Sequence, residues 1–258
     1  MRRRYFFFDI DGTLTDPATG RIVPSAAKTL QQLQEAGHFV AAATGRAHYK
    51  AKAFADGAGI TNMVCAGGGG LVVDGELVEN IPLPLDQAKA FLDEAEKEGR
   101  GWLLMLDDSD CVWMKDYAFL EQAGLRKEPT TYLYEPSLDY RKLDKICKIY
   151  MHVHAGEKVP WLSMLGHLRL APEYIVCQYD AKKDGIMRML QRIGGRAEDV
   201  VVFGDDMNDL VMFDPVWTSI AMGNSCEELK MRADYVTAAS WEDGIRKACQ
   251  YYEWIPED

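Results

Sequence analysis

The chain has 258 residues, of which 48% are hydrophobic and 27% are charged, and its net charge is −11. This composition is typical of a globular protein with a sizeable core. The negative charge argues against a nucleic acid or an anionic membrane as partner, and no apolar stretch is long enough to span a bilayer.

The first part of the chain alternates short apolar runs with helical patterns. Pro24 suits the first turn of a helix and Gly37 its end. Asp74 and Gly75 lie between two apolar segments and predict a β-hairpin. The predicted strands are 5–8, 39–43 and 63–66, and the predicted helices are 24–36 and 47–55.

The middle of the chain, residues 83–180, changes in character. It contains helix-like stretches at 86–98 and 159–168, and strand-like pieces at 102–106, 112–114 and 149–153. We therefore expect an inserted domain of mixed α+β type, between core segments 1–82 and 181–258.

Alternation of strands and helices resumes at Lys182. The predicted helices are 185–193, 206–213 and 241–252, and the predicted strands are 200–203, 220–222 and 235–237. Strand–loop–helix order in both flanks predicts the α/β class, with a parallel sheet covered by helices on both faces.

The six cysteines form no C-x-x-C pair, which excludes the common zinc and redox motifs. Cysteines within apolar runs favour a reducing compartment, so we expect a cytoplasmic protein. The apolar run at the N-terminus ends at Asp9, far too early for a signal peptide.

Four polar or glycine-rich clusters follow predicted strands. They are Asp9 with Asp11, residues 44–46, residues 67–70, and Asp205, Asp206, Asn208 and Asp209. Ligands of open α/β sheets bind at the carboxyl ends of the strands. Each cluster alone could be an ordinary turn, a helix cap or surface, but together, each at a strand exit, they predict a binding site.

The acidic residues of these clusters indicate a metal site. Asp9 and Asp11, two positions apart, should point the same way from a strand, and two close carboxylates repel unless a cation lies between them. With Asp205 they would form the oxygen-rich site that Mg²⁺ prefers.

The same residues suit phosphoryl transfer. An aspartate can attack phosphorus, and a second can protonate the leaving group and then activate water. Thr44 offers a hydroxyl to the phosphate oxygens, and a lysine at 182 or 183 supplies positive charge.

Several segments resemble one known family. Residues 9–15 (DIDGTLT) are similar to the first motif of the haloacid dehalogenase (HAD) superfamily, and residues 204–209 (GDDMND) to its fourth. Residues 44–46 (TGR), 221–225, 233–237 and 242–245 are similar to its Cof-type phosphatase branch. The middle of the chain matches only by position and length.

This resemblance implies a Rossmann-like core with an α/β cap inserted after the third strand. It implies that Asp9 is the nucleophile and a metal ligand. Asp11 is then the general acid/base and a ligand through its backbone carbonyl, and Asp205 is the third protein ligand.

The resemblance also assigns supporting residues. Thr44, with Gly45 and Arg46, would bind the substrate phosphate, and Asn208 would lie close to it. Asp209, with Asp206 beside it, would hold metal-bound water or orient the lysine. The Lys-x-x-Gly-Ile form of the third motif gives Lys182 as the catalytic lysine, with Lys183 as the fallback.

One departure from the branch concerns Gly68–Gly70, which stand where Asn-Gly-Ala is usual. The role of that asparagine in the loop or in substrate contact is then open.

We therefore expect a magnesium-dependent phosphatase of small phosphorylated metabolites, of sugar-phosphate type, acting through an aspartyl-phosphate. A phosphotransferase or phosphomutase on sugar phosphates is the alternative. A second alternative is a non-catalytic phosphate-binding module. The long insertion and Asp11 argue against it, since a binding module needs no acid to protonate a leaving group. The sequence leaves the substrate and the oligomeric state open.

Overall fold

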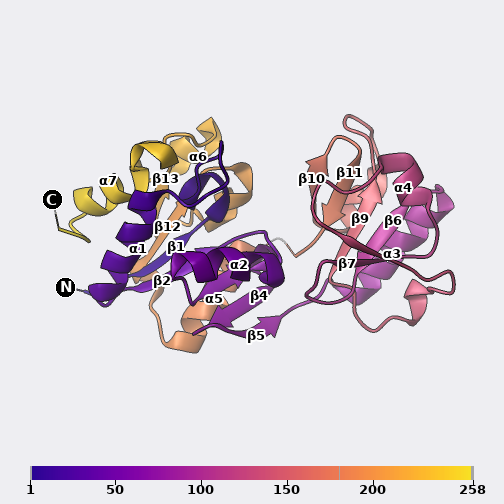
Figure 1. Ribbon diagram of the computed structural model, residues 1–258, viewed down its shortest axis with the longest axis horizontal. Coiled ribbons are helices and arrows are strands. Elements are labelled where there is room, and N and C mark those ends of the chain that lie inside the picture. Colours follow the sequence, from indigo (N-terminus) through magenta and orange to yellow (C-terminus); the bar gives the residue numbers. More distant parts are fainter. Residues whose placement is uncertain (1, 180, 257–258) are drawn as a thin grey trace. The chain divides into compact units, whose positions relative to one another are not determined.

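The computed structural model describes residues 2–179 and 181–256. The chain forms two compact units, one made of residues 1–80 and 181–258 and the other of residues 81–180 (Figure 1). Within the described ranges, no helix combines the length and the hydrophobicity that crossing a bilayer requires. The role of the inserted unit as a cap stays a prediction.

An eight-stranded sheet forms the first unit, in the order β14-β13-β12-β1-β2-β3-β4-β5. Its strands are β1 (Tyr5–Phe8), β2 (Phe39–Ala43), β3 (Met63–Cys65), β4 (Gly70–Val73), β5 (Glu76–Asn80), β12 (Val200–Gly204), β13 (Thr218–Ala221) and β14 (Tyr235–Val236). The strands from β14 to β3 run parallel, whereas β4 and β5 are antiparallel. The hairpin expected at Asp74 and Gly75 joins these last two.

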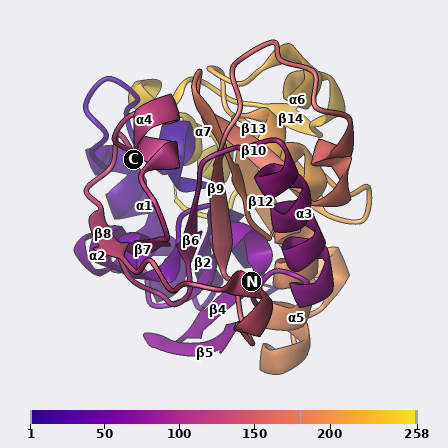
Figure 2. The ribbon, with the colours of Figure 1, turned by 90° about the vertical axis from the view of Figure 1, so that its right-hand side faces the viewer.

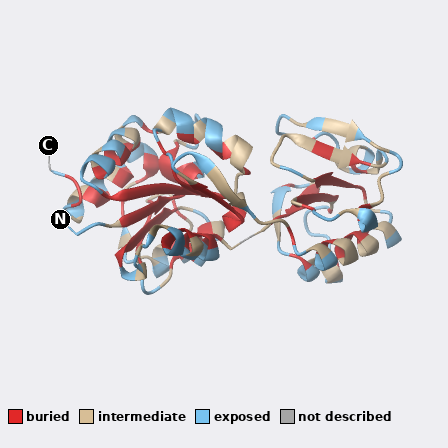
Figure 3. Ribbon diagram, turned by 90° about the horizontal axis from the view of Figure 1, so that it is seen from below, coloured by how far each residue is buried: buried red, intermediate tan, exposed pale blue. Residues whose placement is uncertain are grey.

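Successive side chains of β1 point to opposite faces of the sheet, so the core of this unit has two layers. Phe6 and Phe8 pack with α1 (Pro24–Glu35), α2 (His48–Ala58) and α7 (Gly244–Tyr251). Tyr5 and Phe7 lie on the other face, with α5 (Lys182–Ile193) and α6 (Glu227–Arg232). Buried strands between partly exposed helices are visible in Figure 3. The Rossmann-like α/β core is thus present, with helices on both faces.

Helix α5 approaches the loop after β3 unusually closely. A Cβ on Gly185 would lie 2.5 Å from Val64 Cγ1 and 2.8 Å from the Gly68 carbonyl oxygen. Gly68 has φ +104°, and a Cβ there would meet the Ala181 carbonyl oxygen at 2.3 Å. The glycines therefore let the first turn of α5, which carries Lys182, pack directly on the loop.

The chain leaves and re-enters the first unit beside the same glycines. Asn80, the last residue of β5, pairs with Gly70. Ala181 donates its N–H to the Gly67 carbonyl at 2.7 Å. Residues 81–180 therefore leave the first unit next to Gly70, the first residue of β4, and return next to Gly67 in the loop after β3.

The second unit contains a six-stranded sheet in the order β10-β11-β9-β6-β7-β8. Figure 2 labels all of these strands except β11. Its strands are β6 (Trp102–Met105), β7 (Cys111–Met114), β8 (Thr131–Tyr134), β9 (Lys148–His152), β10 (His167–Ala171) and β11 (Tyr174–Cys177). Its helices are α3 (Leu85–Lys97) and α4 (Ala118–Ala123). Its own apolar core includes Phe91 of α3 and Trp102 of β6.

Three predicted helices differ from the structure. The stretch 159–168 holds only a 3₁₀ turn, Pro160–Met164, and then enters β10, whose pairing with β11 outweighs the local helical pattern. The predicted helix 206–213 is a 3₁₀ helix, η6 (Met207–Met212). The predicted helix 241–252 begins later, because a 3₁₀ turn at Ser240–Glu242 precedes α7.

Candidate active site

Three carboxylates meet at the carboxyl end of the sheet. Asp9, Asp205 and Asp209 each place one oxygen within 4.8 Å of the others. Asp9 follows β1 and Asp205 follows β12, and these neighbouring parallel strands align Phe8 with Phe203. The two aspartates are therefore brought together by strand register, although they lie far apart in the sequence.

A buried lysine joins two of these carboxylates. Lys182 Nζ lies 2.8 Å from Asp9 Oδ1 and 2.6 Å from Asp209 Oδ1, and the side chain is 1% exposed. Lys183, the other lysine considered from the sequence, is half-exposed and pairs with Asp214 at 2.5 Å. Of the two lysines, Lys182 is the one in the acidic cluster.

Asp209 holds the loop that carries Asp205. Its Oδ2 accepts hydrogen bonds from the Asp205 N–H at 2.9 Å and the Asp206 N–H at 3.3 Å. A Cβ on Gly204 would meet the Asp209 Cβ at 2.6 Å, so this close packing requires glycine. Asp206 is exposed and caps η6 by accepting from the Met207 N–H. Both oxygens of Asp209 are thus engaged in orienting Lys182 and the loop.

The electrostatics of the cluster favour protonation or a bound cation. Burial, reinforced by Asp209, raises the pKa of Asp9 well above its usual value, although Lys182 opposes the shift. Burial, again with Asp209, raises the pKa of Asp205 to about 7. For Lys182, burial lowers the pKa but the carboxylates of Asp209 and Asp9 outweigh it, so its pKa is raised and it stays charged.

These residues fit a divalent cation. When ionised, three carboxylates and one lysine leave two negative charges in a buried place, which is the charge that such an ion neutralises. Carboxylate oxygens are the ligands that hard cations prefer. Thr13 donates its hydroxyl hydrogen to Asp205 Oδ1 at 2.9 Å and thereby fixes the orientation of that carboxylate.

Asp11 does not place its side chain in this cluster. The expectation that it points the same way as Asp9 is wrong, because the strand ends at Phe8 and the chain then turns through residues 10–14, where Gly12 has φ +88°. The Asp11 side chain is 62% exposed and pairs with Arg46, whose Nε donates to Asp11 Oδ2 at 2.9 Å and whose Nη2 donates to Oδ1. A ligand role for its backbone carbonyl stays a prediction.

The remaining predicted substrate-binding residues lie around this edge of the sheet. Thr44 is buried and its Oγ1 accepts from the Arg46 N–H at 3.2 Å, so in this state the hydroxyl shapes its own loop. Gly45 is half-buried between them. Asn208 is half-buried on η6, next to Asp209.

Two residues of the site were not singled out from the sequence. One is Thr13, described above. The other is Asn224, whose Nδ2 donates to the Gly12 carbonyl at 2.9 Å while its Oδ1 accepts from the Ser240 N–H at 3.0 Å. The family-like segment 221–225 was the available signal, but a sequence does not reveal which loop such a side chain contacts.

Comparison with known proteins agrees with this architecture. Residues 6–162 and 173–249 match the family described as haloacid dehalogenase-like hydrolase. A Bacillus subtilis protein named "Putative phosphatase YkrA" is 29% identical over 252 residues, which cover 96% of this chain and 97% of the relative.

Two further similarities extend over nearly the whole chain. The 5-amino-6-(5-phospho-D-ribitylamino)uracil phosphatase YitU of Bacillus subtilis is 26% identical, covering 95% of each chain. The crystal structure of a hypothetical protein from Geobacillus kaustophilus HTA426 is similar with a TM-score of 0.81 and 27% identity, covering 98% of this chain and 100% of that one.

Proposed function

Because the chain belongs to the haloacid dehalogenase-like hydrolase family and is a phosphatase, we propose that it hydrolyses small phosphorylated metabolites with Mg²⁺ through an aspartyl-phosphate. The observation that carries this proposal is the buried contact of Lys182 with Asp9 and Asp209, beside Asp205. This contact fixes the orientation of the Asp9 carboxylate, next to the carboxylates that would bind a divalent cation.

Asp9 acts as the nucleophile. One of its carboxylate oxygens attacks phosphorus, and the bond from phosphorus to the leaving oxygen breaks. Lys182, which donates to Asp9 Oδ1 at 2.8 Å, favours the ionised carboxylate and holds it in place. Mg²⁺ held by Asp9, Asp205 and the Asp11 carbonyl would neutralise the phosphate charge.

Asp11 transfers the protons. It gives a proton to the leaving alkoxide and then takes one from the water that attacks the phosphorus of the aspartyl-phosphate. That second attack restores Asp9 and releases inorganic phosphate. The exposure of the Asp11 side chain supports this role, because a proton carrier must reach both the leaving group and water.

The name of one relative supports our choice of substrate class. We place phosphorylated sugars and sugar-like chains first, since the relative YitU is named for a phosphoribityl substrate. None of the six cysteines, all of which the structure describes, forms a disulfide; this supports a reducing compartment, and we propose the cytoplasm.

The test is phosphate release from a panel of phosphorylated sugars, sugar alcohols and sugar bisphosphates, with Mg²⁺ or with EDTA. Asp9→Asn should reduce release by about 1,000-fold or more while the fold remains intact. Asp214→Asn, which removes a carboxylate that pairs with Lys183 outside the cluster, should have little effect. Near-normal turnover by Asp9→Asn would show that another group is the nucleophile.

A further inference from the structure

The turn at residues 222–226 holds the loop that carries Asp205. The Met222 N–H donates to the Gly204 carbonyl and the Cys226 N–H donates to the Asp205 carbonyl, both at 3.0 Å. The buried Ser225 hydroxyl contacts the Met222 carbonyl at 2.6 Å and the Gly204 carbonyl at 3.3 Å. This turn is therefore attached to the end of β12 on both sides of the metal-site carboxylate.

From the same turn, Asn224 reaches the loop after β1. Its Nδ2 donates to the Gly12 carbonyl at 2.9 Å, three residues beyond Asp9. Its Oδ1 accepts from the Ser240 N–H at 3.0 Å, which fixes the orientation of the amide. The Asn224 side chain thus links the loop that follows Asp9 to the turn at residues 222–226, which in turn holds the loop of Asp205.

Gly12 itself lies against Asp205. It has φ +88°, and a Cβ at this position would be 2.2 Å from Asp205 Oδ2. The next residue, Thr13, donates to Asp205 Oδ1 at 2.9 Å. Any shift of the Gly12 peptide therefore moves the hydrogen-bond donor that orients the carboxylate.

We propose that Asn224 is a positioning residue that fixes the two loops relative to each other and so sets the affinity of the metal site. This inference rests on the proposed function, because it requires that Asp9 and Asp205 bind the cation. Asn224 does not contact the ion; it acts through Gly12 and Thr13. Residues that orient metal ligands typically change metal affinity by 10- to 100-fold when removed.

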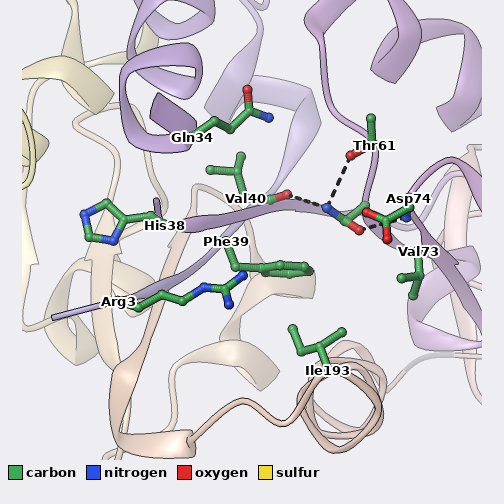
Figure 4. A pocket seen from close by; sticks show the side chains of 10 residues that line it. Arg3, Gln34, His38, Phe39, Val40, Thr61, Val73, Asp74 and Ile193 are labelled. Atoms are coloured by element: carbon green, nitrogen blue, oxygen red, sulfur yellow. Dashed lines mark hydrogen bonds between the residues drawn. The ribbon is translucent and has the colours of Figure 1, made fainter. Parts of the chain in front are cut away.

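A matched control is available at the opposite end of the strands. Asn62 also joins two backbone segments through its amide: Nδ2 donates to the Val40 carbonyl at 3.4 Å and Oδ1 accepts from the Asp74 N–H at 3.0 Å. It borders a hollow of about 420 Å³ whose other lining residues include Phe39 and Ile193 (Figure 4). Truncating Asn62 removes the same kinds of hydrogen bond without touching the acidic cluster.

The experiment measures Mg²⁺ binding to the substrate-free protein by calorimetry, and phosphate release as a function of Mg²⁺ concentration. For Asn224→Ala we expect a Kd for Mg²⁺ about 10-fold higher, with activity largely restored at high Mg²⁺. For Asn62→Ala we expect a lower Tm but an unchanged Kd. Asn224→Ser, which also cannot span to Gly12, replaces Asn224→Ala if that variant does not fold.

Two results would overturn the inference. One is wild-type Mg²⁺ affinity in the Asn224 variants, and the other is an equal loss of affinity in Asn62→Ala, which would indicate a general loss of stability. The Asp205→Asn variant distinguishes a failure of the positioning role of Asn224 from a failure of the proposed function. If it abolishes binding while the Asn224 variants bind normally, only the positioning role fails. If Asp205→Asn binds Mg²⁺ normally, the metal site itself is wrong.

Discussion

Arg46 binds both carboxylate oxygens of Asp11, the residue to which we assign proton transfer. The sequence predicted a substrate contact for Arg46, and the structure adds this pairing. A bidentate partner fixes the plane of a carboxylate more firmly than a single hydrogen bond does. Arg46 can therefore influence turnover through the orientation of Asp11.

We expect Arg46→Met to lower kcat on an alkyl phosphate by about 10-fold more than on 4-nitrophenyl phosphate, since only the alkyl leaving group needs a well-placed acid. The measurement compares kcat and KM on both substrates. Lys52→Met, which removes an exposed ion pair with Asp56 on α2, should leave both unchanged. A loss confined to KM, equal on both substrates, would instead indicate that Arg46 only binds phosphate.

The pKa of Asp205 makes cation binding dependent on pH. Because burial raises this pKa to about 7, a proton on Asp205 stabilises the metal-free fold at low pH. That stability is lost as pH rises from about 4 through 7, since the ionised carboxylate is then unfavourable in the folded state. A bound cation compensates for the loss.

We therefore expect Mg²⁺ to raise the Tm more at pH 8 than at pH 6, which thermal unfolding with Mg²⁺ or EDTA at both values will measure. Asp205→Asn should remove most of this difference between the two pH values. An equal Mg²⁺ effect at both values in the wild type would contradict the assignment of Asp205.

Lys182 and Lys183 show why a sequence alone does not determine which side chain enters a site. Adjacent helical residues point about 100° apart, so the start of the helix decides which one faces the sheet. The structure begins α5 at Lys182, whose side chain is buried while that of Lys183 is half-exposed. The sequence narrowed the choice to two residues, but the contact with Asp9 depends on packing.

Two glycines, Gly68 and Gly185, allow helix α5 to pack close to the sheet. Gly185 faces Val64 and the Gly68 carbonyl at distances that exclude a methyl group. Gly68, within the glycine run 67–70, therefore has a packing function, which is to admit this helix. The position of Lys182, one turn earlier, follows from that close contact.

Gly185→Ala should destabilise the protein by about 1–3 kcal/mol through overpacking and should also lower phosphate release, because α5 must move. Denaturant unfolding and the phosphate assay will test both effects. The control is Gly57→Ala in α2, where a Cβ meets nothing within 4 Å. That change should be neutral or stabilise by up to about 1 kcal/mol. A stable, fully active Gly185→Ala would contradict the argument.

Elements were predictable where local pattern and burial agree. The strands β1, β2 and β12 are short apolar runs buried on both faces, so their sequences are distinctive. Edge strands such as β8 and β10 are only half-buried and depend on a neighbouring strand. Their apolar pattern is weak, and the helix expected at 159–168 shows how local pattern alone then misleads.

The two units have separate hydrophobic cores. The clusters on both faces of the eight-stranded sheet contain only residues of the first unit, and the third cluster contains only residues between Leu83 and Cys177. Asn80 and Ala181 both attach beside the glycine run. Neither core therefore needs residues of the other unit.

Replacing residues 81–180 by a short Gly/Ser linker should leave a folded first unit, and residues 81–180 alone should also fold. Cooperative thermal unfolding and dispersed amide resonances will test each piece. The linked first unit should retain the Tm increase with Mg²⁺, because Asp9 and Asp205 both belong to it. A molten first unit would show that the insertion is required for its packing.

The order of the strands has a consequence for synthesis on the ribosome. β1 lies at the centre of the sheet between β2 and β12, yet β12 begins only at Val200, far along the chain from β1. Until β12 is synthesised, one edge of β1 lacks its partner strand, whereas residues 81–180 are contiguous and have a core of their own. The cluster of Asp9, Asp205, Asp209 and Lys182 is therefore completed only after Asp209 has been synthesised.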